Sequence, residues 1–231
     1  MYIVLIVLLA LACAGIGTWF IIEMEKDNQV KATALKGLTT VCCILIAAIA
    51  LFHTDNRFFA SMVIIGLFFG CLGDVLLALR FVYPTRFNTM FLSGAASFLT
   101  GHIFYVIALY SVAPKAWIVG VPLTVIALGV ELYNSKKHEL DMGKLFLPLG
   151  GYAAFVCFMG CSAVGACVFS FNLGTFLFAI AGICFIVSDS ILSVQCFGKT
   201  PDNVKNRTLH VFYWLAQLLI ALSPMLLCVN A

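Results

Sequence analysis

Two acidic residues lie inside segments that are apolar enough to cross a lipid bilayer. Asp74 stands within residues 63–79, and Asp189 within residues 171–195. Burying a carboxylate at the centre of a bilayer costs about 2.5–3.5 kcal/mol on insertion scales, so an embedded acid is a candidate functional residue by default. Two such groups at similar depth can divide the work of catalysis, one as an acid and the other as a base. The alternative is structural, with each Asp bonded to Lys36 or to a Ser or Tyr on a neighbouring helix.

The residues around Asp74 predict which way it points. Gly66, Gly70 and Asp74 are spaced four apart, so they share one face of a helix. Small residues at this spacing let membrane helices pack closely. We therefore expect Asp74 to point into a helix bundle and not at lipid.

The composition indicates a membrane protein. Of the 231 residues, 63% are hydrophobic and 10% are charged, whereas a soluble domain has about 45–50% apolar and about 25% charged residues. We predict an all-α polytopic transmembrane bundle that forms a single integral membrane domain over residues 1–231. The 10 Cys lie almost all in apolar runs without CxxC spacing, which favours buried free thiols over disulfides or zinc ligands.

About eight segments have the length of a membrane span. The first is interpreted as a retained helix because no basic residue precedes it; a cleaved signal remains the alternative, since Ala12-Cys13-Ala14 is similar to a cleavage site. The predicted segments are 2–22, 34–52, 58–80, 87–110, 115–133, 145–165, 171–195 and 208–229.

The basic residues predict the orientation. Eleven of the 13 Lys and Arg residues follow the first, third, fifth and seventh segments, and only Arg57 and Lys115 lie on the other side. Short loops rich in Lys and Arg face the cytosol, so we expect both termini on the non-cytosolic side. The eleven are Lys26, Lys31, Lys36, Arg80, Arg86, Lys136, Lys137, Lys144, Lys199, Lys205 and Arg207.

With this orientation, the polar residues of the spans gather in their cytosolic halves. The outer halves hold few polar residues beyond hydroxyls, so a site would open toward the cytosol. The gathered residues are Lys36, Thr39, Thr40, Asp74, Ser93, Ser97, Glu131, Asn134, Asp189, His210, Tyr213 and Gln217.

Segments 58–80 and 171–195 also resemble each other weakly around their acids. Each is followed by a segment with a His and a Tyr three residues apart, His102/Tyr105 and His210/Tyr213. Either a parallel repeat of four helices or coincidence would explain this resemblance. Only two embedded His are present, too few for a catalytic zinc site with three protein ligands. The run Gly70-Cys71-Leu72-Gly73-Asp74 lacks the first Gly of the GxGD motif of intramembrane aspartyl proteases.

The ordered motifs resemble the YhhN-like lysoplasmalogenases, which are small eight-helix membrane proteins. The resemblance covers most of the chain, and one departure is Gly37, where related sequences often have Pro after the Lys. The motifs are Lys36 with Leu38-Thr39-Thr40, the run Gly70-Cys71-Leu72-Gly73-Asp74-Val75-Leu76-Leu77, the run Phe98-Leu99-Thr100-Gly101-His102-Ile103-Phe104-Tyr105, the run Phe185-Ile186-Val187-Ser188-Asp189-Ser190, and Tyr213 with Ala216-Gln217.

The resemblance implies hydrolysis of the vinyl ether bond of lysoplasmalogens to a fatty aldehyde and glycerophosphoethanolamine or glycerophosphocholine. It implies Asp74 and Asp189 as the catalytic pair, and a protein of the endoplasmic reticulum membrane. A lysolipid suits the site, with its tail between helices and its phosphate near Lys36 or Arg80. As residues that bind or orient the substrate we expect Lys36, Thr39, His102, Tyr105, Glu131, His210, Tyr213 and Gln217.

We expect membrane lipid and a lysophospholipid substrate as partners, with no nucleic acid, no metal and no cofactor; a homodimer is possible. Two other classes remain open. A proton-coupled transporter also uses embedded acids and internal repeats, although it would carry polar groups through to the outer face. A regulatory or structural membrane protein would use Asp74 and Asp189 for packing alone.

Overall fold

The computed structural model describes residues 2–199 and 202–227. Within them the chain forms eight long helices, each long and apolar enough to cross a membrane. A helix satisfies its own backbone hydrogen bonds, as a lipid-exposed segment must. The predicted all-α transmembrane bundle is confirmed, and the chain is an integral membrane protein. The helices are α1 Tyr2–Glu25, α2 Gln29–Leu51, α3 Arg57–Val82, α4 Phe87–Val112, α5 Trp117–Lys137, α6 Phe146–Phe169, α7 Leu173–Phe197 and α8 Asn203–Leu222.

Helices α2 and α8 begin earlier than hydropathy predicts, because a helix can continue beyond its apolar part into polar residues. Helix α8 begins at Asn203, where the Asp202 side chain accepts a hydrogen bond from the Val204 amide, and α2 begins at Gln29. Asn56 caps α3 in the same way. Residues 228 and 229 of the predicted eighth segment lie outside the described residues.

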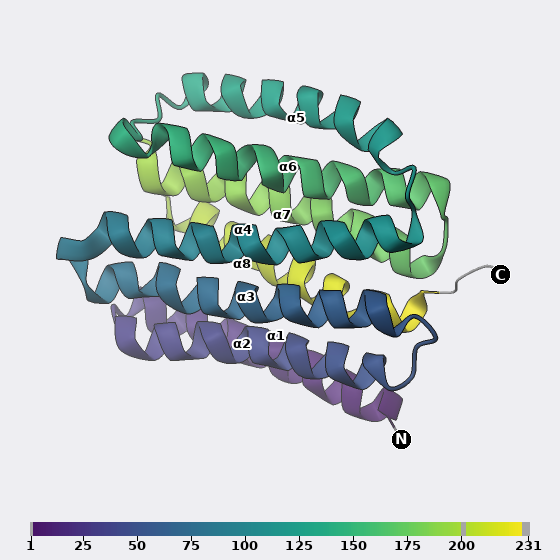
Figure 1. The fold of residues 1–231 in the computed structure, drawn as a ribbon. Coiled ribbons are helices and arrows are strands. Elements are labelled where there is room, and N and C mark those ends of the chain that lie inside the picture. The colour runs from purple at the N-terminus through teal and green to yellow at the C-terminus, as the bar shows by residue number, and fades with distance from the viewer. Residues whose placement is uncertain (1, 200–201, 228–231) are drawn as a thin grey trace.

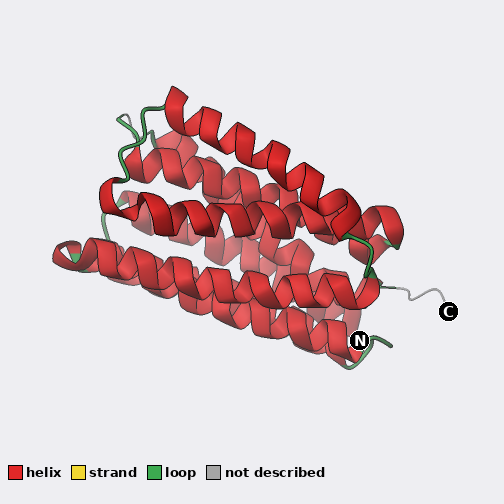
Figure 2. Ribbon diagram, turned by 45° about the horizontal axis from the view of Figure 1, so that its top comes forward, coloured by secondary structure: helices red, strands yellow, loops and turns green. Residues whose placement is uncertain are grey.

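Six helices surround a common centre, and two lie outside them. Helices α2, α3, α4, α6, α7 and α8 contact one another in that order around a closed ring, since α8 also contacts α2. Helix α1 packs outside α2, and α5 packs outside α6 (Figure 1). Successive helices run in opposite directions, and the same nearly parallel arrangement is visible from a second angle in Figure 2. The two faces of the membrane are therefore the two ends of this bundle.

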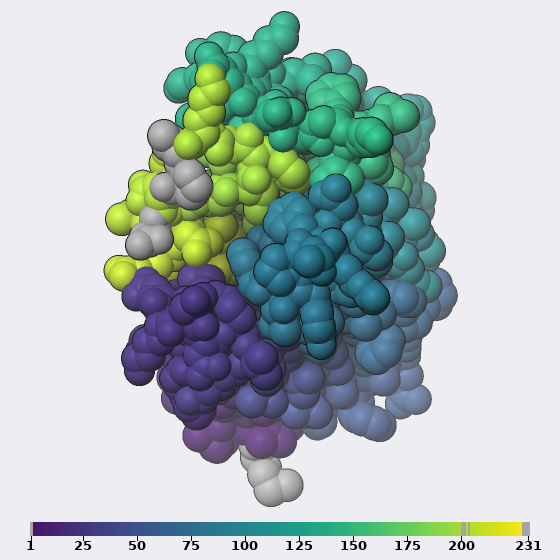
Figure 3. All heavy atoms as spheres, turned by 90° about the vertical axis from the view of Figure 1, so that its left-hand side faces the viewer, coloured from purple at the N-terminus to yellow at the C-terminus, as the bar shows by residue number. Residues whose placement is uncertain are grey.

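The connections after α1, α3, α5 and α7 gather at one end of the bundle, and both termini lie at the other (Figure 1). Figure 3 looks onto the first end, which we call the basic end because the eleven basic residues named above lie in or near these four connections. Lys36 and Arg80 differ from the other nine because their side chains are buried within the bundle.

The half of the bundle away from the basic end is tightly packed. Phe59 and Phe178 are completely buried there, with ring centroids 6.0 Å apart. Helices α3 and α4 approach so closely that a Cβ atom added at Gly101 would lie 2.8 Å from the Gly66 carbonyl oxygen. Small residues at these positions permit that approach, so space for a ligand has to come from the other half.

Candidate active site

A large cavity occupies the half of the bundle at the basic end. Its empty space, open solvent at the mouth included, is about 1710 Å³, and most of its lining residues are apolar. Leu132 of α5 and Phe146 of α6 line it and are each 58% exposed at the outer surface. Between Val125 and Lys137, α5 contributes no buried residue. We infer that the cavity opens beside the second half of α5, toward the surface that would face lipid.

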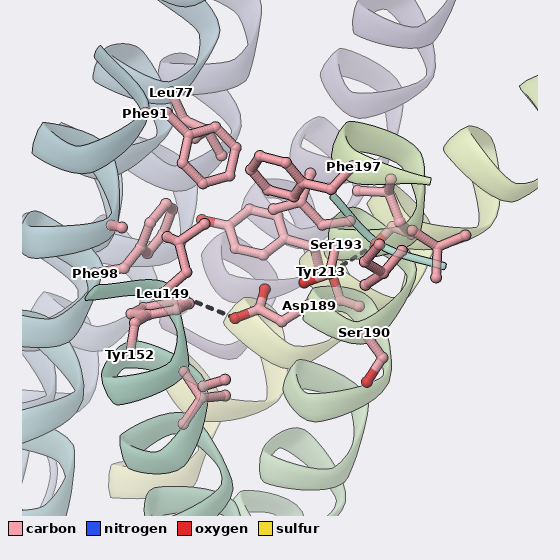
Figure 4. Close-up of a pocket in the computed structure, with 18 of the residues that line it drawn as sticks. Leu77, Phe91, Phe98, Leu149, Tyr152, Asp189, Ser190, Ser193, Phe197 and Tyr213 are labelled. Carbon is pink, nitrogen blue, oxygen red and sulfur yellow. Dashed lines mark hydrogen bonds between the residues drawn. The ribbon is translucent and has the colours of Figure 1, made fainter. Parts of the chain in front are cut away.

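Asp189 lies on the wall of this cavity. It stands on α7, and its Oδ2 accepts a hydrogen bond of 2.7 Å from the Tyr152 hydroxyl of α6. Figure 4 shows the carboxylate pointing into the cavity, with Leu149, Tyr152 and Tyr213 around it. Among the described residues, no Lys or Arg forms an ion pair with Asp189. This carboxyl group can therefore touch a molecule bound in the cavity.

Asp74 is enclosed by protein on all sides. Its exposed fraction is 0%, as the glycine stripe of α3 predicts, and it does not line the cavity. Its Oδ2 accepts hydrogen bonds from the Thr40 hydroxyl at 2.5 Å and from the Tyr213 hydroxyl at 2.7 Å, and Lys36 Nζ lies 3.3 Å from Oδ1. Because Lys36 and Tyr213 both line the cavity, these two side chains connect Asp74 to it.

Hydrogen bonds extend from Asp74 deeper into the bundle. Gln217 donates to the Tyr213 hydroxyl at 2.7 Å and accepts from the Tyr105 hydroxyl at 3.4 Å. The glycine stripe makes room for this chain: a Cβ atom at Gly70 would lie 3.0 Å from Gln217 Nε2, and one at Gly66 would lie 2.2 Å from the Tyr105 ring. Tyr213 is thereby held in one position between Asp74 and the cavity.

Residues 32–224 match the model of the YhhN family. The chain belongs to the YhhN family. The matched range contains both embedded acids and all the side chains that bond to them, whereas α1 lies outside it. No curated protein and no solved structure matches the chain.

In this YhhN family member, some of the residues expected at the site line the cavity and others lie behind it. Lys36, Glu131, His210 and Tyr213 line it with Asp189. Glu131 offers a second carboxylate to the same space, and it accepts a hydrogen bond from the Ser190 hydroxyl. His210 packs against the rings of Phe20 and Trp214.

The remaining expected residues have no contact with the cavity. Tyr105 and Gln217 reach it only through Tyr213. His102 packs against the Phe185 ring at 4.7 Å, and neither of its ring nitrogens has a hydrogen-bond partner among the described residues. The Thr39 hydroxyl donates to the Leu35 carbonyl of its own helix. Thr40 makes the contact with Asp74 in its place, one residue further along α2.

Tyr152 is the residue that the sequence did not reveal. It lies in an apolar stretch of α6 with no acid, amide or His nearby in the chain, so nothing local distinguishes it from a packing residue. Only the contact between α6 and α7 shows that its hydroxyl bonds to Asp189. Among the described residues, no three His, Cys, Asp or Glu side chains lie close enough together to hold a metal ion.

Proposed function

We propose that this protein is a lysoplasmalogenase, a membrane hydrolase that cleaves the vinyl ether bond of lysoplasmalogens. The observation that carries the proposal is the Asp189 carboxyl group on the wall of a mainly apolar cavity that reaches the lipid-facing surface. Membership of the YhhN family and the resemblance described above support the substrate. All residues that line the cavity come from the basic end of the bundle, which favours an enzyme over a transporter with a path across the membrane.

The chemistry begins with a proton. The ether oxygen donates electrons into the double bond, so the outer alkene carbon accepts a proton from the Asp189 carboxyl group, the π bond breaks, and an oxocarbenium ion forms. Water then attacks the carbon next to the oxygen and returns a proton to the Asp189 carboxylate. The resulting hemiacetal collapses to a fatty aldehyde and the free hydroxyl of the glycerol. Proton transfer of this kind contributes about 10²–10⁴-fold in enzymes.

The neighbouring groups have separate roles in this proposal. Tyr152 fixes the orientation of the Asp189 carboxyl group through its hydrogen bond. Tyr213, which Asp74 and Gln217 hold in place, orients the attacking water, and the paired charges of Lys36 and Asp74 keep that part of the wall polar.

The test is to incubate the purified protein with a lysoplasmalogen and to assay the released aldehyde. In heavy water, deuterium should appear on the carbon next to the aldehyde, and the reaction should slow, because the proton comes from an exchangeable group. The aldehyde has to be trapped rapidly to exclude later exchange. The saturated alkyl-ether analogue should bind without being cleaved, and its turnover would contradict the mechanism.

We also propose that the basic end faces the cytosol, so that the site opens there, in the endoplasmic reticulum membrane. Tags at either terminus should then be inaccessible from the cytosol of intact cells, whereas a tag between Lys136 and Lys144 should be accessible. A cytosolic C-terminus would contradict this orientation.

A further inference from the structure

Among the described residues, Arg80 is a buried cation without a counter-charge. It stands in the last turn of α3, its side chain lines the cavity, and its exposed fraction is 6%. Its Nε and Nη1 atoms are buried and have no hydrogen-bond partner, and no carboxylate among the described residues forms an ion pair with it. A buried guanidinium with unsatisfied donors is costly, because desolvation is repaid only when its hydrogen bonds are made.

Aromatic rings hold this guanidinium in place. Its central carbon lies 4.6 Å from the ring centroid of Phe81, 5.0 Å from that of Phe91 and 5.8 Å from that of Phe87. Cation–π contacts favour a cation at this position, but a ring cannot accept the in-plane N–H bonds of a guanidinium. The edge of the group therefore stays available for an anion with two oxygen acceptors.

Lys36, the other buried cation on the wall, is already paired. Its Nζ lies 3.3 Å from Asp74 Oδ1, so an anion would compete with that carboxylate. Arg80 has no such competitor.

The level of Arg80 in the bundle matches the dimensions of a lysolipid. Both Arg80 and Phe197, the last residue of α7, pack on the ring of Phe91, at 5.0 Å and 5.3 Å, so Arg80 lies level with the end of α7. Asp189 is eight residues before that end, which at 1.5 Å per residue is about 12 Å along the helix axis. In a lysoplasmalogen, the phosphorus and the outer alkene carbon are separated by roughly 8–9 Å of extended chain at ordinary bond lengths, and side chains span the remainder.

We propose that Arg80 binds the phosphodiester of the lysophospholipid headgroup and thereby sets the depth at which the vinyl ether meets Asp189. The inference rests on the proposed function for its substrate. The headgroup lies at the mouth of the cavity, the glycerol passes Lys36 and His210, and the tail continues past Ile186 and Leu128 toward the lipid-facing opening.

The experiment compares ligands with and without phosphate on full-length protein in detergent. Binding is measured as the thermal stabilisation that a non-cleavable 1-alkyl lysophosphocholine or the matching 1-alkylglycerol produces. Turnover is measured with 1-alkenyl lysophosphocholine and with 1-alkenylglycerol. For Arg80→Met, the apparent affinity and kcat/KM for the phospholipids should fall at least about tenfold, the scale of a lost charge-assisted hydrogen bond. Both values for the phosphate-free ligands should stay at the wild-type level.

Two further variants keep the test decisive. Arg86→Met removes the same charge from an exposed residue that does not line the cavity, and it should change nothing. Arg80→Lys keeps the positive charge but cannot donate two parallel hydrogen bonds, so this variant should lose part of the preference for ligands with phosphate. It keeps the test available if Arg80→Met does not fold.

The outcomes separate this inference from the proposed function. Phosphate-dependent binding that needs Arg80, without any aldehyde release, would retain the binding site and overturn the hydrolase. Aldehyde release with an unchanged preference for phosphate in both Arg80 variants would retain the hydrolase and overturn the site. Stabilisation by inorganic phosphate alone, equal to that by the lysolipid, would indicate a free-anion site and overturn the lipid assignment.

Discussion

Asp74 and Asp189 stand equally deep in the bundle, yet their surroundings differ. Each is eight residues, or about 12 Å, before the last residue of its helix, and α3 and α7 run in the same direction. Asp74 is fully enclosed and has two hydroxyl donors and a Lys, whereas Asp189 lines the cavity with one phenol as its donor. Both accept a hydrogen bond from the helix that precedes their own.

The two carboxyl groups therefore suit different roles, although the sequence predicted them as one catalytic pair. A carboxyl group that transfers a proton to a substrate has to reach it, and Asp189 does. A carboxylate that is shielded by its own donors instead holds those donors in position. In the proposed mechanism, Asp74 therefore combines a structural role with an indirect effect on the cavity, while Asp189 transfers the proton.

The largest expected effect is that of Asp189→Asn on turnover. The amide keeps the volume and can still accept the bond from Tyr152, but it cannot transfer a proton, so aldehyde release should fall by about 10²–10⁴-fold. Thermal melting should stay near that of the wild type. The control is Asp55→Asn in the exposed loop between α2 and α3, which should leave both unchanged; near-normal turnover of Asp189→Asn would make this residue structural.

Asp74→Asn should reduce both turnover and stability. It leaves the buried Lys36 without a counter-charge, and breaking a buried ion pair in this way costs about 3–5 kcal/mol. The double variant with Lys36→Met should regain most of the stability without regaining turnover, which thermal melting and aldehyde release measure separately. A single Asp74→Asn variant that melts like the wild type would show that the pair is not needed for folding.

Variants of Tyr152 and Tyr213 should show the same difference between the two Asp sites, with smaller effects. Tyr152→Phe removes one hydrogen bond to Asp189, so turnover should fall about 10–100-fold, the equivalent of about 1.5–3 kcal/mol for a bond to a charged group. Tyr213→Phe also leaves Gln217 Nε2 without its acceptor, so it should lower the melting temperature more than Tyr152→Phe does. Equal melting temperatures for the two variants would contradict the expectation that Tyr213 contributes more to stability than Tyr152 does.

The smallest expected difference in stability is between variants of two adjacent Thr residues on α2. Thr40→Val removes a buried donor to Asp74 and should cost about 1–1.5 kcal/mol of stability. Thr39→Val removes only a bond to the carbonyl of its own helix, so it should change stability by less than about 0.5 kcal/mol. Melting curves of the two variants, prepared side by side, measure this, and a larger loss from Thr39→Val would reverse the assignment of the two residues.

The sequence by itself determined the membrane class, the eight helices and the burial of Asp74, because each follows from local composition or from a spacing within one helix. A bilayer leaves few alternatives for an apolar segment of about 20 residues. Glycines four apart likewise predict a packed face, whichever helix packs on it. The gathering of the basic residues at one end also follows from the alternating direction of successive spans, because the connections after every second span share one end.

Only the tertiary structure decided which polar groups meet. The contact between α6 and α7 brings Tyr152 to Asp189, and the rotation of α2 brings Thr40, and not Thr39, to Asp74. The exposure of Asp189 depends on the cavity, whose wall combines residues of several helices, and the enclosure of Asp74 depends on side chains of α2 and α8. Contacts of this kind arise from side chains on different helices, and a pattern within one segment holds no information about the rotation of its neighbours.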